Sequence, residues 1–342
     1  MNRIYPLKFR PIIKDKIWGG ERLKDLLNKK TKTSKAGESW EISGFPGSVS
    51  RVCNGFLAGN NLEELIEIYM GDLVGEGIFE KFGTLFPLLI KFIDANDVLS
   101  IQVHPDNKLA SKLFNSYGKT EMWYILEADP GSEIVIGFNK KVNREEYLHN
   151  LKNKTLPEVL NKEKVSPGDV FYIPSGRVHS IGSGILLAEI QQTSDATLRI
   201  YDFDRVDENG KPRPLHNDKA LDAIDFNVYP TYRTGYEKSV NTSNHILSCD
   251  YFTTNYLFLD KPVKKDYLNL DSFVIYICLE GEVDIRYYEN NAETIIKGET
   301  ILVPAEINVI DLMPKSTARL LEVYIEDKSA VEKVGDVLEK LF

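Results

Sequence analysis

The chain has 342 residues, 42% of them hydrophobic and 27% charged, and a formal net charge of −9 at pH 7. The length allows two domains, and the acidic balance argues against a nucleic-acid partner, which would need a basic surface. No apolar run reaches the roughly 18 residues of a membrane span, and residues 1–16 lack the apolar core of a secretory signal. The three cysteines, Cys53, Cys249 and Cys278, have no metal or redox spacing, so free buried thiols and a cytoplasmic location are expected.

The first part of the chain is expected to hold helices around one strand. Leucines at helical spacing predict a short helix at 21–30, and the stretch 37–43 predicts a strand. Residues 62–81 show the 3.6-residue period of an amphipathic helix, which Gly75 and Gly77 interrupt.

Strands are then expected to dominate from residue 85 to residue 136. Three apolar side chains alternate there with three polar ones: Leu99, Ile101 and Val103 with Ser100, Gln102 and His104. Residues two apart in a strand share a face, so Gln102 and His104 point the same way. Pro105 ends this strand because it donates no backbone hydrogen bond.

The middle of the chain predicts a change of domain. Residues 143–164 are polar and predict one or two surface helices, and strands resume at 165–202. Residues 206–232 are rich in proline and glycine and are expected to connect two domains, 1–232 and 233–342.

The last part of the chain echoes the first. After residue 248 the pattern is that of strands throughout, and an amphipathic helix at 330–341 closes the chain. Residues 168–174 and 298–304 share one pattern of Gly, acid, strand and Pro, which predicts two small β-barrels of one type.

The second barrel is not expected to repeat the polar centre of the first. It has Val309 where the first has His179, and no histidine follows His245. A structural or lid role is therefore expected for it.

Potential metal ligands lie on three separate strands of the first barrel. His104, Glu121 and His179, with Gln102, would give a divalent metal a shell of nitrogen and oxygen ligands. Glu121 enters an apolar strand, where an unpaired carboxylate would be costly. Two alternatives stay open: the histidines could be hydrogen-bonded barrel residues, and Gln102 could support a ligand rather than bind the metal.

Several motifs in order resemble the type I mannose-6-phosphate isomerase family in its short two-cupin form. They are residues 100–106, 119–124, 174–179 and 191–205, together with 18–20 and 37–41. The resemblance implies a mainly β fold of two cupin-type (jelly-roll) barrels with a few peripheral helices. It also implies an aldose–ketose isomerase that interconverts mannose 6-phosphate and fructose 6-phosphate through an enediolate.

The same resemblance implies a set of site residues. One Zn²⁺ per chain would be held by Gln102, His104, Glu121 and His179. Arg199 would be catalytic and Glu189 is the first candidate for the base. Substrate-binding positions would be Lys91, Ser100, Lys119, Trp18 and Glu38. The long forms insert a helical domain between Glu121 and His179, and this chain has only a short stretch there.

Other interpretations of these residues stay open. Arg199 could simply pair with Asp195, Lys91 and Lys119 could be surface lysines, and Glu38 or water could replace Glu189 as the base. A non-haem iron cupin oxygenase and a non-catalytic sugar-binding cupin are the alternative functions. A small sugar phosphate is the expected partner, with no nucleic acid and no membrane, and the chain is expected to be a monomer or a homodimer.

Overall fold

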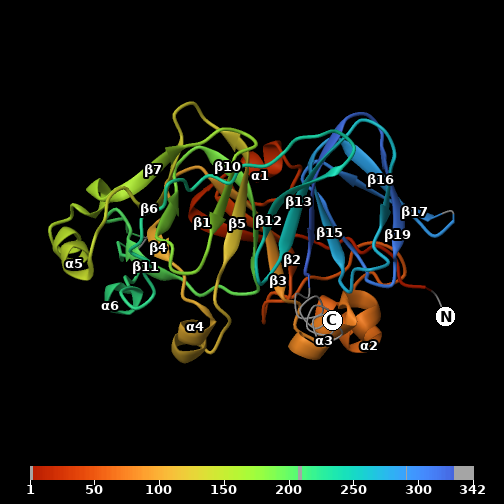
Figure 1. Cartoon of the computed structure of the whole chain (residues 1–342), viewed down its shortest axis with the longest axis horizontal. Coiled ribbons are helices and arrows are strands. Elements are labelled where there is room, and N and C mark those ends of the chain that lie inside the picture. Colours follow the sequence, from red (N-terminus) through yellow and green to blue (C-terminus); the bar gives the residue numbers. More distant parts are fainter. Residues whose placement is uncertain (1–2, 207–209, 290, 327–342) are drawn as a thin grey trace, which may run out of the picture. The chain divides into compact units, whose positions relative to one another are not determined.

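The computed structural model describes residues 3–206, 210–289 and 291–326. The chain forms two compact units, and both are discontinuous in sequence (Figure 1). Unit 1 comprises residues 1–10, 46–87 and 236–342, and unit 2 comprises residues 11–45 and 88–235. The segment 206–232, expected as a connection, thus lies within unit 2, and the continuous domains 1–232 and 233–342 stay a prediction.

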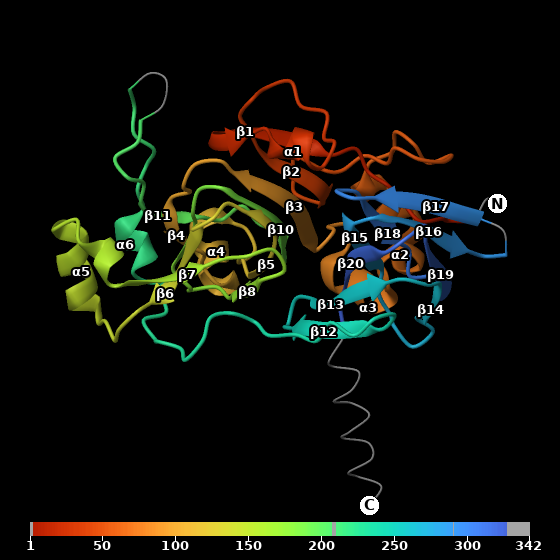
Figure 2. The same cartoon turned by 90° about the horizontal axis from the view of Figure 1, so that it is seen from above.

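Unit 2 contains two antiparallel sheets. The order of the first is β1 (Ile12–Gly20), β2 (Ala36–Ser43), β3 (Leu88–Ala95), β10 (Ile185–Gln192), β5 (Glu121–Ala128) and β8 (Val170–Ile173). The order of the second is β11 (Leu198–Tyr201), β4 (Ile101–Val103), β9 (His179–Ile181), β6 (Glu133–Phe138) and β7 (Leu160–Lys164). Figure 2 shows β1, β2 and β3 side by side at one edge of the first sheet.

The two sheets of unit 2 pack on a shared apolar core. Trp123 and Phe171 from the first sheet belong to the same buried cluster as Ile134 and Ile181 from the second. The outer face of the second sheet is buried as well, against helices α5 (Arg144–Lys152) and α6 (Asn217–Ala220) and the turn η1 (Leu156–Glu158). Figure 1 shows α5 and α6 on this side, beside β4, β6 and β11.

Unit 1 repeats the plan of two antiparallel sheets. The first has the order β12 (Ser243–Ser248), β13 (Thr253–Leu259), β20 (Ala318–Tyr324), β15 (Val274–Glu280) and β18 (Thr300–Val303). The second has the order β14 (Val263–Asp266), β19 (Val309–Pro314), β16 (Glu282–Tyr287) and β17 (Asn291–Ile296). Helices α2 (Leu62–Val74) and α3 (Glu76–Phe82) belong to the same unit.

The mainly β class with a few helices is confirmed, and the helix at 62–81 is broken at Gly75. Gly75 has a φ of +100°, a conformation that glycine adopts without strain. The helix expected at 21–30 is shorter, α1 (Arg22–Asp25). The helix expected at 330–341 lies outside the described residues.

Other local expectations were confirmed in part. Helix α5 and the turn η1 lie in the segment 143–164, but strand β7 occupies its end. Strands dominate from 85 to 136, and helix α4 (Asn107–Phe114) interrupts them. Of the three thiols only Cys278 is buried, because Cys53 is exposed and Cys249 is half-buried. Among the described residues, no helix combines the length and hydropathy needed to cross a membrane.

Candidate metal centre and substrate cavity

The strands of unit 2 bring three ligand candidates to one point. Glu121 begins β5, His179 begins β9, and His104 follows the end of β4. Glu121 Oε2 lies 3.5 Å from His104 Nε2, and Glu121 Oε1 lies 3.5 Å from His179 Nε2. One ligand atom from each of the three residues lies within 4.8 Å of the others, and all three side chains are buried.

Gln102 completes this cluster from β4. It pairs directly with His179 across the β4–β9 ladder, and its Nε2 lies 3.2 Å from His179 Nε2. A carboxamide presents either nitrogen or oxygen by half a rotation, so the same position can offer an oxygen ligand. The structure thus brings all four predicted metal ligands together.

Backbone contacts fix the orientation of both imidazoles. His104 Nδ1 lies 2.9 Å from the carbonyl oxygen of Ala196, and His179 Nδ1 lies 2.8 Å from that of Arg177. A proton on each Nδ1 leaves Nε2 with a free lone pair directed at the cluster. This arrangement is typical of histidines that bind metal ions, whose other ring nitrogen donates to a carbonyl or carboxylate.

The protonation states also suit a cation. Burial, helped by the nearby Lys119 ammonium, lowers the pKa of His104 to about 4, so its ring is neutral at pH 7. Burial raises the pKa of Glu121, but Lys119 and the two histidines outweigh this and hold it well below the usual range. Within the described chain, His104 Nε2 and Glu121 Oε1 have no hydrogen-bond partner. Buried polar atoms without partners are costly, so the cluster fits a bound divalent metal ion.

A cavity of about 270 Å³ opens beside Gln102. Its volume is just below the roughly 300–1,000 Å³ typical of small-molecule sites. The predicted residues that line it are Trp18, Glu38, Lys91, Ser100, Gln102, Lys119, Glu189 and Arg199. The sequence-based catalytic and substrate residues therefore share one cavity with a metal-ligand candidate.

Two of the three lysines of this cavity form buried ion pairs. Lys91 Nζ lies 3.0 Å from Glu189 Oε2, and Lys119 Nζ lies 2.9 Å from Glu121 Oε2. Lys91 and Lys119 are both buried, so neither is a surface lysine. The charges of these two ammonium groups are already balanced by carboxylates.

Two tryptophans hold two of the three carboxylates of the cavity in place. Trp40 Nε1 donates to Glu38 Oε2 at 2.6 Å, and Trp123 Nε1 donates to Glu189 Oε1 at 3.1 Å. Each indole thus fixes one acidic side chain, which also accepts an ion pair from a lysine of the same cavity.

Arginines gather on another part of the cavity wall. Arg199 donates to Ser100 Oγ at 3.3 Å and to the Pro214 carbonyl at 3.0 Å, rather than to Asp195. Arg213 forms a two-pronged pair with Asp202, which also accepts from Arg205 at 2.6 Å. Burial lowers the pKa of Arg199, and Arg213 lowers it further, as expected where cations exceed carboxylates.

Some residues of the cavity were not predicted as site residues. The polar or aromatic ones among them are Lys16, Trp123, Asp195, Thr197 and Arg213. In an extended segment, residues two apart share a face, so Asp195 and Thr197 could have been predicted to lie on the same face as Arg199. Arg213 comes from an irregular segment, and no sequence pattern indicates its position.

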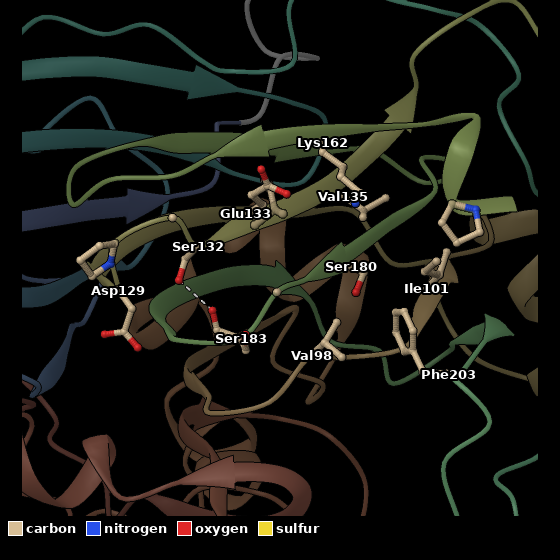
Figure 3. Close-up of a pocket in the computed structure, with 15 residues that line it drawn as sticks. Val98, Ile101, Asp129, Ser132, Glu133, Val135, Lys162, Ser180, Ser183 and Phe203 are labelled. Atoms are coloured by element: carbon tan, nitrogen blue, oxygen red, sulfur yellow. Dashed lines mark hydrogen bonds between the residues drawn. The ribbon is translucent and has the colours of Figure 1, made fainter. Parts of the chain in front are cut away.

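A second cavity of unit 2, of about 420 Å³, lies on the outer side of the second sheet (Figure 3). Ile101 and Ser180 line it, and they are the sequence neighbours of Gln102 and His179 on the opposite face. Its charged side chains are Asp129, Glu133 and Lys162, an acidic balance that does not suit a phosphate. None of the predicted site residues lines it.

Comparison with known proteins agrees with this geometry. Residues 7–139 match the catalytic domain of type I phosphomannose isomerase. The chain is 42% identical to mannose-6-phosphate isomerase of Streptococcus mutans over 64% of this chain and 67% of that protein. It is 38% identical to mannose-6-phosphate isomerase ManA of Bacillus subtilis over 72% of this chain and 78% of that protein.

A solved structure supports the same assignment over nearly the whole chain. The mannose 6-phosphate isomerase of Bacillus subtilis matches with a TM-score of 0.85 and 32% identity, over 94% of this chain and all of that one. The fold, the polar cluster and these similarities agree, and the chain belongs to the type I phosphomannose isomerase family.

Proposed function

We propose that the protein interconverts mannose 6-phosphate and fructose 6-phosphate with one Zn²⁺ held by Gln102, His104, Glu121 and His179. The observation that carries this proposal is the buried His104–Glu121–His179 cluster next to a cavity rich in cations. Two neutral imidazoles with a carboxylate and a carboxamide form a donor set that suits zinc. When bound, the zinc ion would stabilise negative charge on the two oxygens of an enediolate.

Arg199 is placed to help at the reacting end of the substrate. Its Nε donates to Ser100 Oγ, which lies 3.5 Å from Gln102 Oε1, so the guanidinium is two contacts away from the metal centre. A guanidinium keeps its charge at every relevant pH and can stabilise oxygen atoms that become negative.

Glu189 is the base in this proposal, because it lies in the cavity, fixed by Trp123 and flanked by Lys91. Glu38 is a weaker alternative. Burial raises its pKa, but Lys91 and Lys16 outweigh this and lower it to about 2. A carboxylate with so low a pKa is a poor proton acceptor near neutral pH.

The phosphate group would lie against the arginines. Lys91 and Lys119 already balance Glu189 and Glu121, so a dianion gains less from them. Arg213 and Arg205 share Asp202, and Arg199 has no carboxylate partner among the described residues. A planar guanidinium binds phosphate in a two-pronged contact, and Arg199 is assigned to the reacting end, so Arg213 is the proposed anchor.

A coupled assay with mannose 6-phosphate tests the function, together with metal analysis of the purified protein. We expect turnover that a chelator abolishes and added Zn²⁺ restores, while His179→Ala loses the metal. Full activity of a verified metal-free sample would refute the proposed chemistry. Stoichiometric iron with substrate-dependent oxygen consumption would instead support the oxygenase alternative.

Substitution of Arg213 tests the phosphate position. Arg213→Ala should raise KM for mannose 6-phosphate by about tenfold or more, because a charge-assisted contact worth about 1.5–3 kcal/mol is lost. Arg144→Ala removes an exposed arginine of the same unit, on α5, and serves as the matched control. An unchanged KM in Arg213→Ala would place the phosphate elsewhere.

A further inference from the structure

Unit 1 contains a large polar cavity of its own, of about 780 Å³. It opens above Glu322 in the middle of strand β20, and the Glu322 side chain is only 1% exposed. A buried carboxylate in the centre of a sheet needs several polar partners, because removing its charge from water is costly. The strands of unit 1 supply these partners from both sheets.

The partners of Glu322 form a closed network. Oε1 accepts from Lys265 at 2.7 Å, from Tyr267 at 2.5 Å and from Tyr276 at 3.1 Å. Oε2 accepts from Ser243 and from Asn255, both at 2.8 Å. Burial raises the pKa of Glu322, but Lys265 and these donors outweigh this and lower it below its ordinary value. The carboxylate is therefore charged and rigidly held at the floor of the cavity.

The floor of this cavity is the counterpart of the catalytic cavity in unit 2. Glu189 on β10 lies opposite Lys91 on β3 and Trp123 on β5. Glu322 on β20 lies opposite Asn255 on β13 and Tyr276 on β15. Both sheets continue in the same order, to β8 and to β18.

The sequence repeat confirms that these residues occupy equivalent positions in the two units. Trp123 pairs with Phe171 on β8, and Tyr276 pairs with Ile301 on β18. Phe171 and Ile301 are the fourth residues of the two repeats, 168–174 and 298–304. In both units an aromatic side chain on the neighbouring strand donates to the central carboxylate, and a lysine pairs with it.

The charges of the two cavities differ. The catalytic cavity is lined by five cations, Lys16, Lys91, Lys119, Arg199 and Arg213, and by three carboxylates, Glu38, Glu189 and Asp195. The cavity of unit 1 is lined by two lysines, Lys264 and Lys265, and by three carboxylates, Asp266, Glu322 and Glu326. Lys265 already neutralises Glu322, so the cavity of unit 1 offers no surplus cation for a phosphate.

The remaining lining favours hydroxyl groups as ligands. Tyr324 and Thr242 present hydroxyls to the cavity, and Asn269 presents a carboxamide. Ser243 and Asn255 line it too, but both donate to Glu322. Hydroxyls and carboxamides both donate and accept hydrogen bonds, as a molecule with several neighbouring hydroxyls requires. The volume falls within the roughly 300–1,000 Å³ of small-molecule sites. We propose that this cavity of unit 1 is a second binding site, for an uncharged polyhydroxylated molecule of the size of a free monosaccharide.

Saturation-transfer NMR on the full-length protein tests the site, with mannose, fructose, glucose and inositol as probes. We expect at least one of them to bind. Thr242 is exposed at the cavity rim, so Thr242→Trp should abolish this binding by filling the entrance without disturbing the network around Glu322. Mannose 6-phosphate turnover should be unchanged in this variant, so failure of the second site and failure of the proposed function are distinguishable.

A conservative pair of variants separates a specific contact from a general effect. Tyr324→Phe removes one cavity hydroxyl and should weaken binding about fivefold, the value of one hydrogen bond. Tyr288→Phe removes a hydroxyl that contacts the Ile4 carbonyl outside the cavity and should leave binding unchanged. Absence of transfer from every probe, or binding that survives Thr242→Trp, would overturn the proposal. Equal weakening by both phenylalanine variants would also overturn it.

Discussion

At the scale of single residues, charged side chains around the candidate metal ligands and in the cavity beside Gln102 pair with side chains of opposite charge. Three lysines, Lys16, Lys91 and Lys119, each lie within 3.0 Å of a carboxylate oxygen. A buried ion pair gains little net stability, but the loss of one partner leaves the other charge buried and unpaired. These lysines therefore balance the charges of the carboxylates, and arginines carry the surplus charge.

The contribution of one such carboxylate, Glu38, to stability can be measured from its dependence on pH. Its pKa of about 2, against an ordinary value of 4.5, means that the folded protein favours the charged form. The resulting stability is fully present above pH 4.5 and is lost as pH falls through 2. The stability difference between the wild type and Glu38→Gln should therefore grow by about 2 kcal/mol from pH 3 to pH 6. Urea unfolding at a series of pH values measures it.

The same experiment has an internal control. In Lys16→Met one of the two cations that lower the pKa of Glu38 is absent, so the pH-dependent part of the difference should shrink. A difference that stays constant with pH in the wild-type background would show that Glu38 is not held in its charged form by the fold.

At the scale of elements, helix α4 connects the candidate metal ligand His104 to the cavity residue Lys119. It begins directly after His104 and Pro105, and its N-cap Asp106 accepts a hydrogen bond from the Leu109 amide at 2.8 Å. At the other end of the segment, the Lys119 amide donates to the Pro105 carbonyl at 3.2 Å. The segment that contains this short helix is thus a closed loop, which fixes the positions of His104 and Lys119 relative to each other.

Asp106→Ala should cost about 1 kcal/mol, the usual value of a lost N-cap, and lower the melting temperature by roughly 3 °C. Asp106→Asn keeps the capping oxygen and should be close to the wild type. Thermal unfolding of the three proteins checks this expectation. An asparagine variant as unstable as the alanine variant would show that the charge of Asp106, and not its cap, is what matters.

Elements were predictable where their periodicity is long and uniform. The strand at 37–43 and the helical period at 62–81 follow from side-chain alternation and spacing, and both exist. Helix α4 was missed because it is short and follows a strand pattern, although Asp106 is a clear N-cap signal. Strand β7 was missed because its sequence, Leu160–Lys164, is mostly polar and its alternation is weak.

At the scale of the whole molecule, the sequence indicated two β units but not how the chain is divided between them. Residues 46–87 pack with unit 1 although unit 2 lies on both sides of them in sequence, and no local pattern encodes such a long-range choice. The site was more predictable than this division, since motifs on separate strands indicated the candidate metal ligands. Arg213 was not, because its place depends on the tertiary path of an irregular segment.

Reporter residues separate the two units experimentally. The three tryptophans, Trp18, Trp40 and Trp123, all lie in unit 2, whereas the three cysteines all lie in unit 1. Burial raises the pKa of Cys278 to about 12, so this thiol reacts only when unit 1 opens. With Cys53→Ser and Cys249→Ser, tryptophan fluorescence reports on unit 2, and thiol labelling reports on unit 1.

We expect metal removal to destabilise unit 2 alone. A metal ion bound only by the folded form contributes about 4 kcal/mol when its free concentration exceeds Kd roughly a thousandfold. Chelation should therefore lower the fluorescence transition of unit 2 by roughly 10 °C, since 1 kcal/mol corresponds to about 2–4 °C in a domain of this size. The temperature at which Cys278 becomes reactive should not change, because each unit has its own sheets and polar centre. Equal shifts of both transitions would show that the chain unfolds as one cooperative structure, and no shift in either would contradict the metal site itself.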